Sequence, residues 1–395
     1  MLFQRDIMRE IAGVLYGDEF IVIMGARQTG KTSVLISLKD RLEKKGEACS
    51  YINLENPVYL ASFNAHPYAI FDFLPKSGRR QFVFIDEIQY LNDPTNFLKL
   101  LYDEKRTEIK IIASGSSSFY IDRKFKDSLA GRKYLFELHT LNFNEFIAFN
   151  KQDELLEQKD KKLSPYYSEK LLKSWESYIL YGGYPKAVLA DTGQQKKVII
   201  EDLGLSYVKK DITEAGIKNT DKYFHLMRIL ASQTGQLVNA QELSSTLQTP
   251  HKTIEEYLYV MKKSYQVSLI KPFHSNIRKE LTKMPKIYFN DIGLRNFFLA
   301  DYTPMDKRND KGAYLENIVF RELLRKMKNA EAIRFWRTQD KSEVDFIAGK
   351  NAYEVKYEAV RKKSIYKPFI EQYPEIHLKF INRNDILKYF YGWKI

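Results

Sequence analysis

The first 150 residues alternate short apolar runs with amphipathic stretches. The apolar runs have the length and the composition of buried strands. Strands that alternate with helices favour a parallel sheet covered by helices, which is the α/β fold class. We therefore expect residues 1–150 to form an α/β core with strands near 20–24, 49–54, 81–86, 109–113 and 133–137.

Between 151 and 217 the pattern becomes helical and charged. The sequence YGGYP at 181–185 interrupts this stretch, because glycine and proline are strong helix breakers. We interpret 151–217 as a helical lid.

Residues 218–304 begin with a helix, continue as LVNAQELSSTLQT, and then enter a second helix that Pro250 starts. An extended segment that reaches KMPKIYFN follows. This order of elements predicts a winged-helix-like domain. The polar segment 305–309 has no apolar period, and we place a domain boundary there.

Residues 305–395 are expected to form a second, smaller α/β domain. It opens with the helical run AYLENIVFRELLRKM, and strands near 344–347 and 352–357 follow, joined by the turn AGKN. A helix and the strand HLKFIN complete the chain. The period of two along a strand places Glu354 and Lys356 on one face.

With 395 residues, the chain has room for several domains. No stretch approaches the roughly twenty apolar residues of a membrane span. The amino terminus, MLFQRDIMREI, carries charges where a signal peptide needs an apolar core, and the sole cysteine, Cys49, excludes an intrachain disulfide or a zinc-binding cysteine cluster. We expect a cytoplasmic protein without a membrane partner.

The formal net charge of +13 and a pI near 9.3 favour an anionic partner such as DNA, although a dispersed lysine-rich surface that serves only solubility would give the same values. Positive charge is concentrated between 261 and 290, where a basic strand pair would touch the phosphates of a duplex as a wing. Alternatively, the winged helix packs on the nucleotide domain and transmits its state. The basic residues of this segment are Lys262, Lys263, Lys271, Arg278, Lys279, Lys283 and Lys286, and its acidic residue is Glu280.

The segment FIVIMGARQTGKT at 20–32 carries the pattern G-x-x-x-x-G-K-T directly after an apolar strand. Two glycines permit close backbone approach, so that consecutive N–H groups wrap phosphates at the start of a helix. Lys31 would reach the β- and γ-phosphates, and the Thr32 hydroxyl can ligate Mg²⁺. The predicted nucleotide-binding loop consists of Gly25, Ala26, Arg27, Gln28, Thr29, Gly30, Lys31, Thr32 and Ser33.

A second motif, QFVFIDEIQ at 81–89, is an apolar strand that ends in two carboxylates. Asp86 would bind Mg²⁺ directly or through water, and Glu87 is placed to orient and deprotonate the attacking water. A third strand, IKIIASGSSS, ends in hydroxyl groups at Ser114, Ser116, Ser117 and Ser118. Because ligands of parallel sheets lie at the carboxyl ends of the strands, these strand ends predict one nucleotide site.

The last domain carries carboxylates in the order E…D…ExK, with Glu316 on the helix, Asp345 on one strand, and Glu354 and Lys356 on the next. Two of these carboxylates could share a divalent ion, while Lys356 positions a water and balances charge at a scissile phosphate. The arrangement resembles the PD-(D/E)xK nuclease fold, in which Glu316 would be the additional acidic residue. Glu-x-Lys on a strand also occurs as a solvent-facing ion pair, so cleavage of DNA stays open.

Further short motifs are SLAGR at 128–132, GGYP at 182–185 and YFNDIGLRN at 288–296. With GARQTGKT, FIDEIQ, SGSSS, EVDF and YEVK, their order resembles that of bacterial and archaeal AAA-type ATPases with a C-terminal DUF4143 domain. The resemblance implies ATP as the nucleotide, sensor roles for Ser114 and Ser116, and a lid that includes Gly183 and Pro185. It also implies an arginine finger, Arg132 or Arg123, that acts on a neighbouring subunit of a ring, although each arginine taken singly could be a solvated surface residue.

Together these features predict an ATP hydrolase that uses Mg²⁺ and acts on DNA in junction processing, repair or defence. The rival hypothesis is a regulatory switch in which ATP occupancy changes assembly or partner binding and the C-terminal domain binds without cutting. A third alternative is a partner of a toxin module or mobile element.

Overall fold

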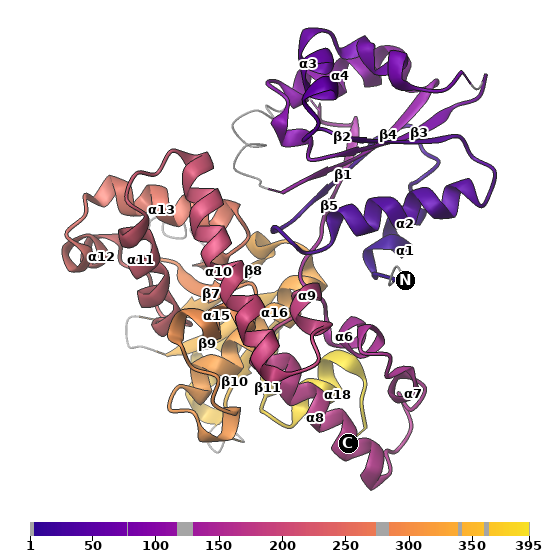
Figure 1. Cartoon of the computed structure of the whole chain (residues 1–395). Coiled ribbons are helices and arrows are strands. Elements are labelled where there is room, and N and C mark those ends of the chain that lie inside the picture. The colour runs from indigo at the N-terminus through magenta and orange to yellow at the C-terminus, as the bar shows by residue number, and fades with distance from the viewer. Residues whose placement is uncertain are drawn as a thin grey trace. The chain divides into compact units, whose positions relative to one another are not determined.

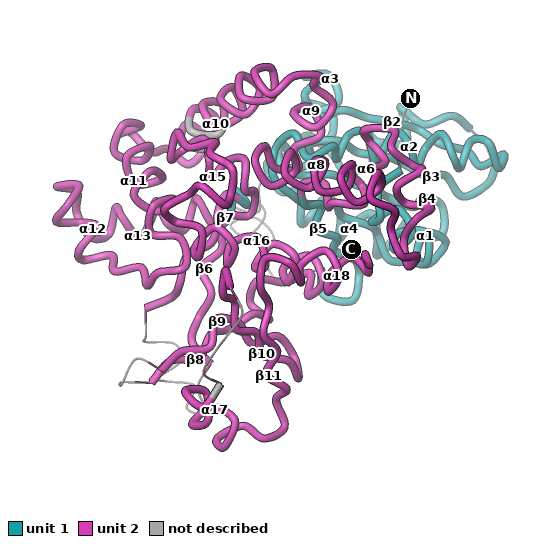
Figure 2. Tube along the Cα trace, turned by 90° about the horizontal axis from the view of Figure 1, so that it is seen from below, with its two compact units in different colours: residues 1–139, 263–265 teal, residues 140–262, 266–395 magenta. Residues whose placement is uncertain are grey.

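The computed structural model describes residues 4–76, 78–116, 129–273, 284–338, 342–358 and 363–394. The chain divides into two compact units (Figure 2): unit 1 is residues 1–139 with 263–265, and unit 2 is residues 140–262 with 266–395. Apart from 263–265, the predicted lid, winged-helix and C-terminal segments all lie in unit 2. The division of the chain into four domains stays a prediction.

Unit 1 contains a five-stranded parallel sheet in the order β2-β3-β4-β1-β5 (Figure 1). The predicted strands are confirmed, and so is the α/β fold class; β4 extends two residues further than expected, and β2 ends one residue earlier. The strands are β1 (Phe20–Met24), β2 (Cys49–Asn53), β3 (Gln81–Asp86), β4 (Ile109–Gly115) and β5 (Lys133–Glu137).

Helices cover both faces of this sheet, and strand residues alternate between the two faces. Ile21 and Ile23 face one hydrophobic cluster, while Val22 and Met24 face the other. Burial on both faces explains why the strands are apolar throughout. One face is covered by α1 (Ile7–Ala12) and α2 (Lys31–Glu43), and the other by α3 (Pro57–Ala65), α4 (Pro94–Lys105) and the 3-10 segments η1 (Pro67–Phe73) and η2 (Ile88–Tyr90).

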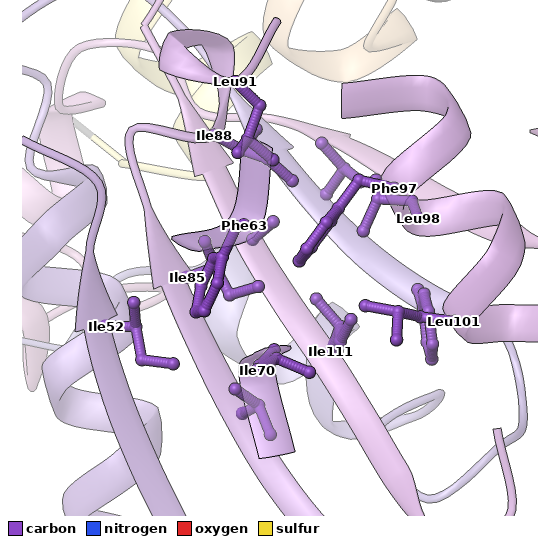
Figure 3. Packing of buried hydrophobic residues seen from close by; sticks show 14 of the residues in the cluster. Ile52, Phe63, Ile70, Ile85, Ile88, Leu91, Phe97, Leu98, Leu101 and Ile111 are labelled. Atoms are coloured by element: carbon purple, nitrogen blue, oxygen red, sulfur yellow. The ribbon is translucent and has the colours of Figure 1, made fainter. Parts of the chain in front are cut away.

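Figure 3 shows the second of these faces, where aromatic and aliphatic side chains fill the space between the sheet and α3 and α4. Phe63 stacks on Phe97 with ring centroids 5.6 Å apart. Ile85 and Ile111 reach this layer from β3 and β4. This packing holds the carboxyl ends of β3 and β4 in place, and the predicted nucleotide residues follow those ends.

The amino-terminal half of unit 2 is helical, as predicted. The helix α8 ends at Tyr181, Gly182 follows with φ +74°, and α9 starts at Pro185, so the YGGYP sequence does interrupt the helices. Pro250 directly precedes α13, as expected. The helices are α6 (Phe143–Phe149), α7 (Asp153–Leu156), α8 (Pro165–Tyr181), α9 (Pro185–Val188), α10 (Gly193–Ala215), α11 (Thr220–Ser232), α12 (Ala240–Leu247) and α13 (His251–Lys263).

The rest of unit 2 is built on a six-stranded mixed sheet in the order β11-β10-β9-β8-β6-β7. The predicted hairpin of β9 and β10 is confirmed as an antiparallel pair. The strands are β6 (Val267–Pro272), β7 (Lys286–Phe289), β8 (Ile333–Arg337), β9 (Glu343–Ala348), β10 (Asn351–Val355) and β11 (His377–Ile381). The helices are α15 (Ile292–Leu299), α16 (Lys311–Met327), α17 (Lys367–Gln372) and α18 (Asp385–Tyr391), with 3-10 segments η4 (Met305–Lys307), η5 (Ala330–Ala332) and η6 (Lys363–Tyr366).

This sheet joins the predicted winged helix to the predicted C-terminal domain. β6 pairs in parallel with β8 through Lys271 opposite Arg334 and Pro272 opposite Phe335. β7 pairs with β6 in the antiparallel sense, which is the strand pair expected of a wing. The boundary that we expected near Met305 therefore lies between strands that share one sheet.

Candidate functional site

The loop between β1 and α2 has the backbone that its glycines predict. A Cβ atom on Gly25 would lie 2.2 Å from the Leu138 carbonyl oxygen, so only glycine fits there. Gly30 has φ +96°, in the left-handed region that favours glycine, and α2 begins at the next residue, Lys31. Consecutive loop N–H groups thus lead into a helix N-terminus, an arrangement that binds phosphate groups. Arg27 and Gln28 lie between the glycines, and Ser33 lies in the first turn of α2.

Side chains of this loop form hydrogen bonds with backbone carbonyl groups of the same loop. Lys31 Nζ donates to the carbonyl oxygens of Gly25 at 3.1 Å and Ala26 at 2.8 Å. Thr29 Oγ1 donates to the Ala26 oxygen at 2.9 Å. The ammonium of Lys31 therefore lies inside the loop that would hold the phosphates.

Asp86 ends β3 and is the centre of a hydroxyl cluster. Thr32 Oγ1 donates to Asp86 Oδ2 at 2.6 Å, Tyr51 OH donates to the same oxygen at 2.8 Å, and Ser114 Oγ donates to Asp86 Oδ1. Asp86 is buried. A carboxylate beside a threonine hydroxyl at the end of a phosphate loop is the donor set that Mg²⁺ takes in nucleotide sites, so these residues fit the ion.

Glu87 is held at both its backbone and its side chain. Its φ is +58°, and its N–H donates to Ser114 Oγ at 3.3 Å. Gln89 Nε2 donates to the Glu87 carboxylate and to Ser116 Oγ at 2.9 Å. The structure therefore brings Glu87, Ser114 and Ser116 together, as predicted from the three strand ends.

Arg132 lies just before β5 and forms a two-point ion pair within unit 1. Its Nε lies 2.7 Å from Asp103 Oδ1, and its Nη2 lies 3.3 Å from Asp103 Oδ2. A finger role would require Arg132 to leave Asp103, and this role stays a prediction. Arg123, Ser117 and Ser118 lie outside the described residues.

The GGYP sequence occupies a tight junction inside unit 2. Gly183 N–H donates to Asp291 Oδ2 at 2.9 Å, and its carbonyl accepts from Leu141 N at 2.7 Å. Asp291 also caps α15 by accepting from Gly293 N and Leu294 N. Gly183 therefore has a structural role in unit 2. Contact of Pro185 with a nucleotide stays a prediction.

The predicted carboxylates of the C-terminal domain lie in one group, which also includes Glu343. We call Glu316, Glu343, Asp345 and Glu354 the carboxylate cluster. Lys356 Nζ pairs with Glu354 and lies 3.9 Å from Asp345 Oδ2. The backbone N–H of Val355 donates to Asp345 Oδ2 at 2.8 Å, and Tyr366 OH donates to Glu354 Oε1 at 2.7 Å.

Lys286, the first residue of β7, inserts into this cluster. Its Nζ lies 3.3 Å from Glu316 Oε1 and 3.7 Å from Asp345 Oδ1, and it also pairs with Glu343. Only 2% of Lys286 is exposed. The expectation that Lys286 touches DNA phosphates from a wing is therefore wrong, because its ammonium is buried among carboxylates.

Burial and neighbouring charges both shift the pKa values of this cluster. The pKa of Glu316 is raised to about 7 by burial first and by the Asp345 charge second, although Lys286 opposes the shift. The pKa of Glu354 is raised to about 7 by the same two causes, against the effect of Lys356. Burial lowers the pKa of Lys286, but the charges of Glu316, Asp345 and Glu343 outweigh it and raise this pKa overall, so the ammonium stays charged.

Within the described ranges, no three acidic, histidine or cysteine side chains are arranged to hold a metal ion. As placed, Glu316 and Asp345 contact Lys286, and Glu354 contacts Lys356. A metal in this cluster does not fit the present arrangement, in contrast to Mg²⁺ beside Asp86. The ligand set of Glu316, Asp345 and Glu354, with Lys356 as the catalytic lysine, stays a prediction.

The other described residues of the basic segment differ in exposure and in ion pairing. Lys271 is exposed, whereas Lys262 pairs with Glu331 at 3.0 Å. Arg278, Lys279 and Lys283 lie outside the described residues. The exposed face of α13 carries His251 and Lys252 at its start, and also the carboxylates Glu255 and Glu256.

Sequence reasoning missed three residues of the nucleotide site: Arg5, Tyr51 and Gln89. Arg5 is buried, and it donates to the Thr29 carbonyl and to the His139 carbonyl, each at 2.7 Å. Gln89 lies inside the FIDEIQ motif, so its distance of two residues from Glu87 was a usable signal. Arg5 and Tyr51 have no local motif, and only the fold places them at the site.

Comparison with known protein families accounts for most of the chain. Residues 17–147 match the AAA domain, residues 172–304 match a domain of unknown function (DUF8612), and residues 311–387 match a domain of unknown function (DUF4143). The first match spans β1 to β5 and contains the glycine-rich loop, Asp86 and Glu87, although Arg5 precedes it. The order of these matches, an AAA domain followed by a C-terminal DUF4143 domain, agrees with the resemblance that the sequence motifs carry.

Relatives that match most of this chain occur in a bacterium and an archaeon. An uncharacterized protein of Haemophilus influenzae is 29% identical over 90% of this chain and 86% of its own length. One of Methanocaldococcus jannaschii is 26% identical over 96% of this chain and 86% of its own length. The Thermotoga maritima RuvB Holliday junction branch migration motor covers 71% of this chain and 95% of its own, with 15% identity and a TM-score of 0.36, too low to carry weight for function.

None of the helices in the described part of the chain combines the length and the apolar character that a membrane span needs.

Proposed function

We propose that this protein binds and hydrolyses ATP with Mg²⁺ and acts on DNA. The observation that carries the first part is the 2.6 Å contact between Thr32 Oγ1 and Asp86 Oδ2, beside the glycine loop and at the carboxyl end of a parallel sheet. The match of this region to the AAA domain supports the same conclusion.

Each residue of the site has a defined task in this proposal. Lys31 leaves the loop carbonyls and binds the β- and γ-phosphates, while Thr32 and Asp86 hold the ion. When bound, Mg²⁺ neutralises charge on the phosphates. Glu87 accepts a proton from the attacking water. Ser114 contacts both Asp86 and the Glu87 backbone, and it keeps the metal ligand and the base in fixed positions relative to each other.

DNA is proposed as the partner because of the net charge of +13 and the order of elements from α11 to β7. The start of α13, with His251, Lys252 and Thr253, is the segment that would enter a major groove. Lys271 is an exposed cation on β6. Binding of this kind depends on phosphate contacts and should weaken steeply with salt.

The experiment is ATP turnover with and without branched, single-stranded and duplex DNA, together with DNA affinity between low and physiological salt. We expect DNA to raise turnover and the affinity to fall linearly in a double-logarithmic plot with a slope near −3 or steeper, equivalent to about three phosphate contacts or more. The replacement Lys252→Glu should weaken binding to all DNA sequences, whereas Lys350→Glu, in the β9–β10 turn, is the matched control. Turnover that ignores DNA, with no salt-dependent binding, would leave an ATPase that does not act on DNA.

We also propose that Arg132 acts as a finger in a ring-like homo-oligomer, that Pro185 belongs to a lid over the nucleotide, and that the protein is cytoplasmic. If Arg132 acts in trans, Arg132→Ala should lower turnover without weakening ATP binding, and mixing it with Glu87→Gln subunits should restore part of the activity. No recovery on mixing would exclude a finger in trans.

A second candidate function, a nucleotide-dependent switch whose C-terminal domain does not cut DNA, is favoured by one observation. Lys286 occupies the carboxylate cluster in which a nuclease would need its metal ion. A switch should turn over ATP slowly, assemble when ATP is bound, and leave DNA intact in the presence of Mg²⁺ or Mn²⁺. Cleavage that disappears in Asp345→Ala would instead establish a nuclease.

A further inference from the structure

Cations of the chain itself lie among the side chains of the carboxylate cluster and offset part of its negative charge. Four carboxylates, Glu316, Glu343, Asp345 and Glu354, meet the two ammonium groups of Lys286 and Lys356. Arg337 contributes a more exposed guanidinium 3.5 Å from Glu343. Buried carboxylates need such partners, because isolated ionised groups are strongly disfavoured away from water.

The two lysines divide the cluster around Asp345. Lys286 lies on the Oδ1 side with Glu316 and Glu343, and Lys356 lies on the Oδ2 side with Glu354. Asp345 Oδ2 is further engaged by the backbone N–H of Val355. Both oxygens of the carboxylate that would be central to a metal site therefore already face positive or donor groups.

The position of Lys286 is set by the fold. Its backbone pairs with Ile270 in the β6–β7 ladder, and its Nζ lies 5.5 Å from the centroid of the Phe335 ring. Tyr288, on the same face of β7, donates its hydroxyl to Glu316 Oε1. Strand pairing, an aromatic wall and a neighbouring hydrogen bond thus hold the ammonium between Glu316 and Asp345.

We infer that Lys286 takes the place of a divalent cation between Glu316 and Asp345. The cluster keeps its arrangement through this internal lysine, and a divalent cation binds on the Glu316 side only when Lys286 is displaced. The inference does not depend on the ATP site.

The side of the cluster that contains Lys356 differs from the Lys286 side in one respect. Glu354 Oε2 is buried without a hydrogen-bond partner, whereas Glu354 Oε1 receives Tyr366 OH and pairs with Lys356. A single open oxygen beside an ammonium is a poor cation site, because divalent ions prefer several oxygen ligands. Lys286, and not Lys356, is therefore the lysine that competes with a metal ion.

The test is Mn²⁺ binding by the full-length, nucleotide-free chain, followed by electron paramagnetic resonance of the free ion. The variants are Lys286→Met, Asp345→Asn, the double variant, and the matched control Lys271→Met, an exposed lysine on β6. Mn²⁺ that binds near Asp86 should bind equally to all variants, so it does not change the difference in Mn²⁺ binding between them. Lys286→Met removes a cation that lies less than 4 Å from Glu316 and Asp345. This variant should therefore bind one Mn²⁺ more than the wild type, and its affinity at that site should be at least about tenfold higher than that of the wild type.

That additional site should disappear in the double variant, and Lys271→Met should behave as the wild type. The inference is overturned if the wild type already binds Mn²⁺ at a site that Asp345→Asn removes. It is equally overturned if Lys286→Met folds and gains no site.

Loss of Lys286 leaves carboxylates without a counter-charge, so Lys286→Met could fail to fold in plain buffer. Thermal unfolding with and without Mn²⁺ then decides the question. The ion should raise the midpoint of Lys286→Met by several degrees and leave that of Lys286→Arg unchanged, because arginine keeps the charge. A Lys286→Met chain that Mn²⁺ does not rescue would contradict the inference.

Discussion

Gln89 Nε2 donates a hydrogen bond to the carboxylate of Glu87, two residues before it, and a second one to Ser116 Oγ. Ser116 N–H donates back to Gln89 Oε1 at 3.3 Å. Glu87 itself has φ +58°, a left-handed conformation that is uncommon for glutamate and is typical of functional positions. Gln89 therefore ties the proposed base at the end of β3 to the end of β4.

Replacement of Gln89 by alanine should lower kcat for ATP hydrolysis by about tenfold to a hundredfold, because Glu87 loses the donor that orients it. KM should change by less than about twofold, since Gln89 is not part of the glycine loop. Steady-state kinetics on Gln89→Ala measure both values, with Gln241→Ala, an exposed glutamine on α12, as the control. An unchanged or raised kcat would contradict a positioning role for Gln89.

Arg5 should stabilise the glycine loop. Because Arg5→Met leaves the Thr29 and His139 carbonyls without a charged donor, we expect it to lower the free energy of unfolding by about 2–3 kcal/mol and to raise KM for ATP. Urea unfolding followed by circular dichroism and steady-state kinetics provide the two readouts. Arg9→Met, on the exposed side of α1, should leave both unchanged; equal effects of the two replacements would refute a specific role for Arg5.

Gly183 should tolerate no side chain. A Cβ there would lie 2.3 Å from the Leu141 carbonyl oxygen, so Gly183→Ala should cost about 1–3 kcal/mol of stability through overpacking. A Cβ on Gly312, in the first turn of α16, would meet nothing within 4 Å, and Gly312→Ala should be neutral or stabilising by about 0.5–1 kcal/mol. Thermal unfolding of both variants checks the prediction, which fails if Gly183→Ala melts with the wild type.

Asp310 should make unit 2 sensitive to acid. Burial alone would raise its pKa, but hydrogen bonds and charges from Arg308 and Arg295 outweigh burial and lower the pKa from 3.8 to about 2. A carboxyl group whose pKa is lower in the folded state stabilises the fold fully above its unfolded pKa, and this contribution is lost as the pH falls from about 4 through 2.

Asp310→Asn should therefore cost about 3–5 kcal/mol at neutral pH, because the buried guanidinium of Arg295 loses its carboxylate, and it should flatten the pH dependence between 4 and 2. Urea unfolding at pH 7, 4 and 2.5 measures both effects. Asp306→Asn, an exposed neighbour, is the control. Identical pH slopes for Asp310→Asn and the wild type would rule out this ion-pair account.

The strands of unit 1 and the glycine loop were predictable because their signals are local. Apolar runs such as Phe20–Met24 are buried on both faces, and Gly25 and Gly30 occupy backbone positions that other residues rarely take. The grouping of Asp86, Ser114 and Thr32 followed from one rule, that the carboxyl ends of parallel strands meet at one edge.

The C-terminal cluster was predictable only in part. The period of two predicted Glu354 and Lys356 on one side of a strand, and the hairpin places Asp345 next to Glu354. The strand β10 ends at Val355, so Lys356 follows it directly instead of lying within it, but its ammonium still reaches Glu354. Lys286 comes from a distant strand, and its place among the carboxylates depends on the parallel pairing of β6 with β8. Without knowledge of that pairing, the sequence predicts that a lysine in a basic segment lies at the surface.

The most direct test of the account is the rate of phosphate release from ATP by the wild type, Glu87→Gln and Thr32→Val, with Mg²⁺ and with the ion chelated. The account predicts Mg²⁺-dependent turnover by the wild type, a fall of about a hundredfold or more in Glu87→Gln with ATP still bound, and weaker Mg²⁺ dependence in Thr32→Val. Equal rates for the wild type and Glu87→Gln, or turnover that persists without Mg²⁺, would contradict it.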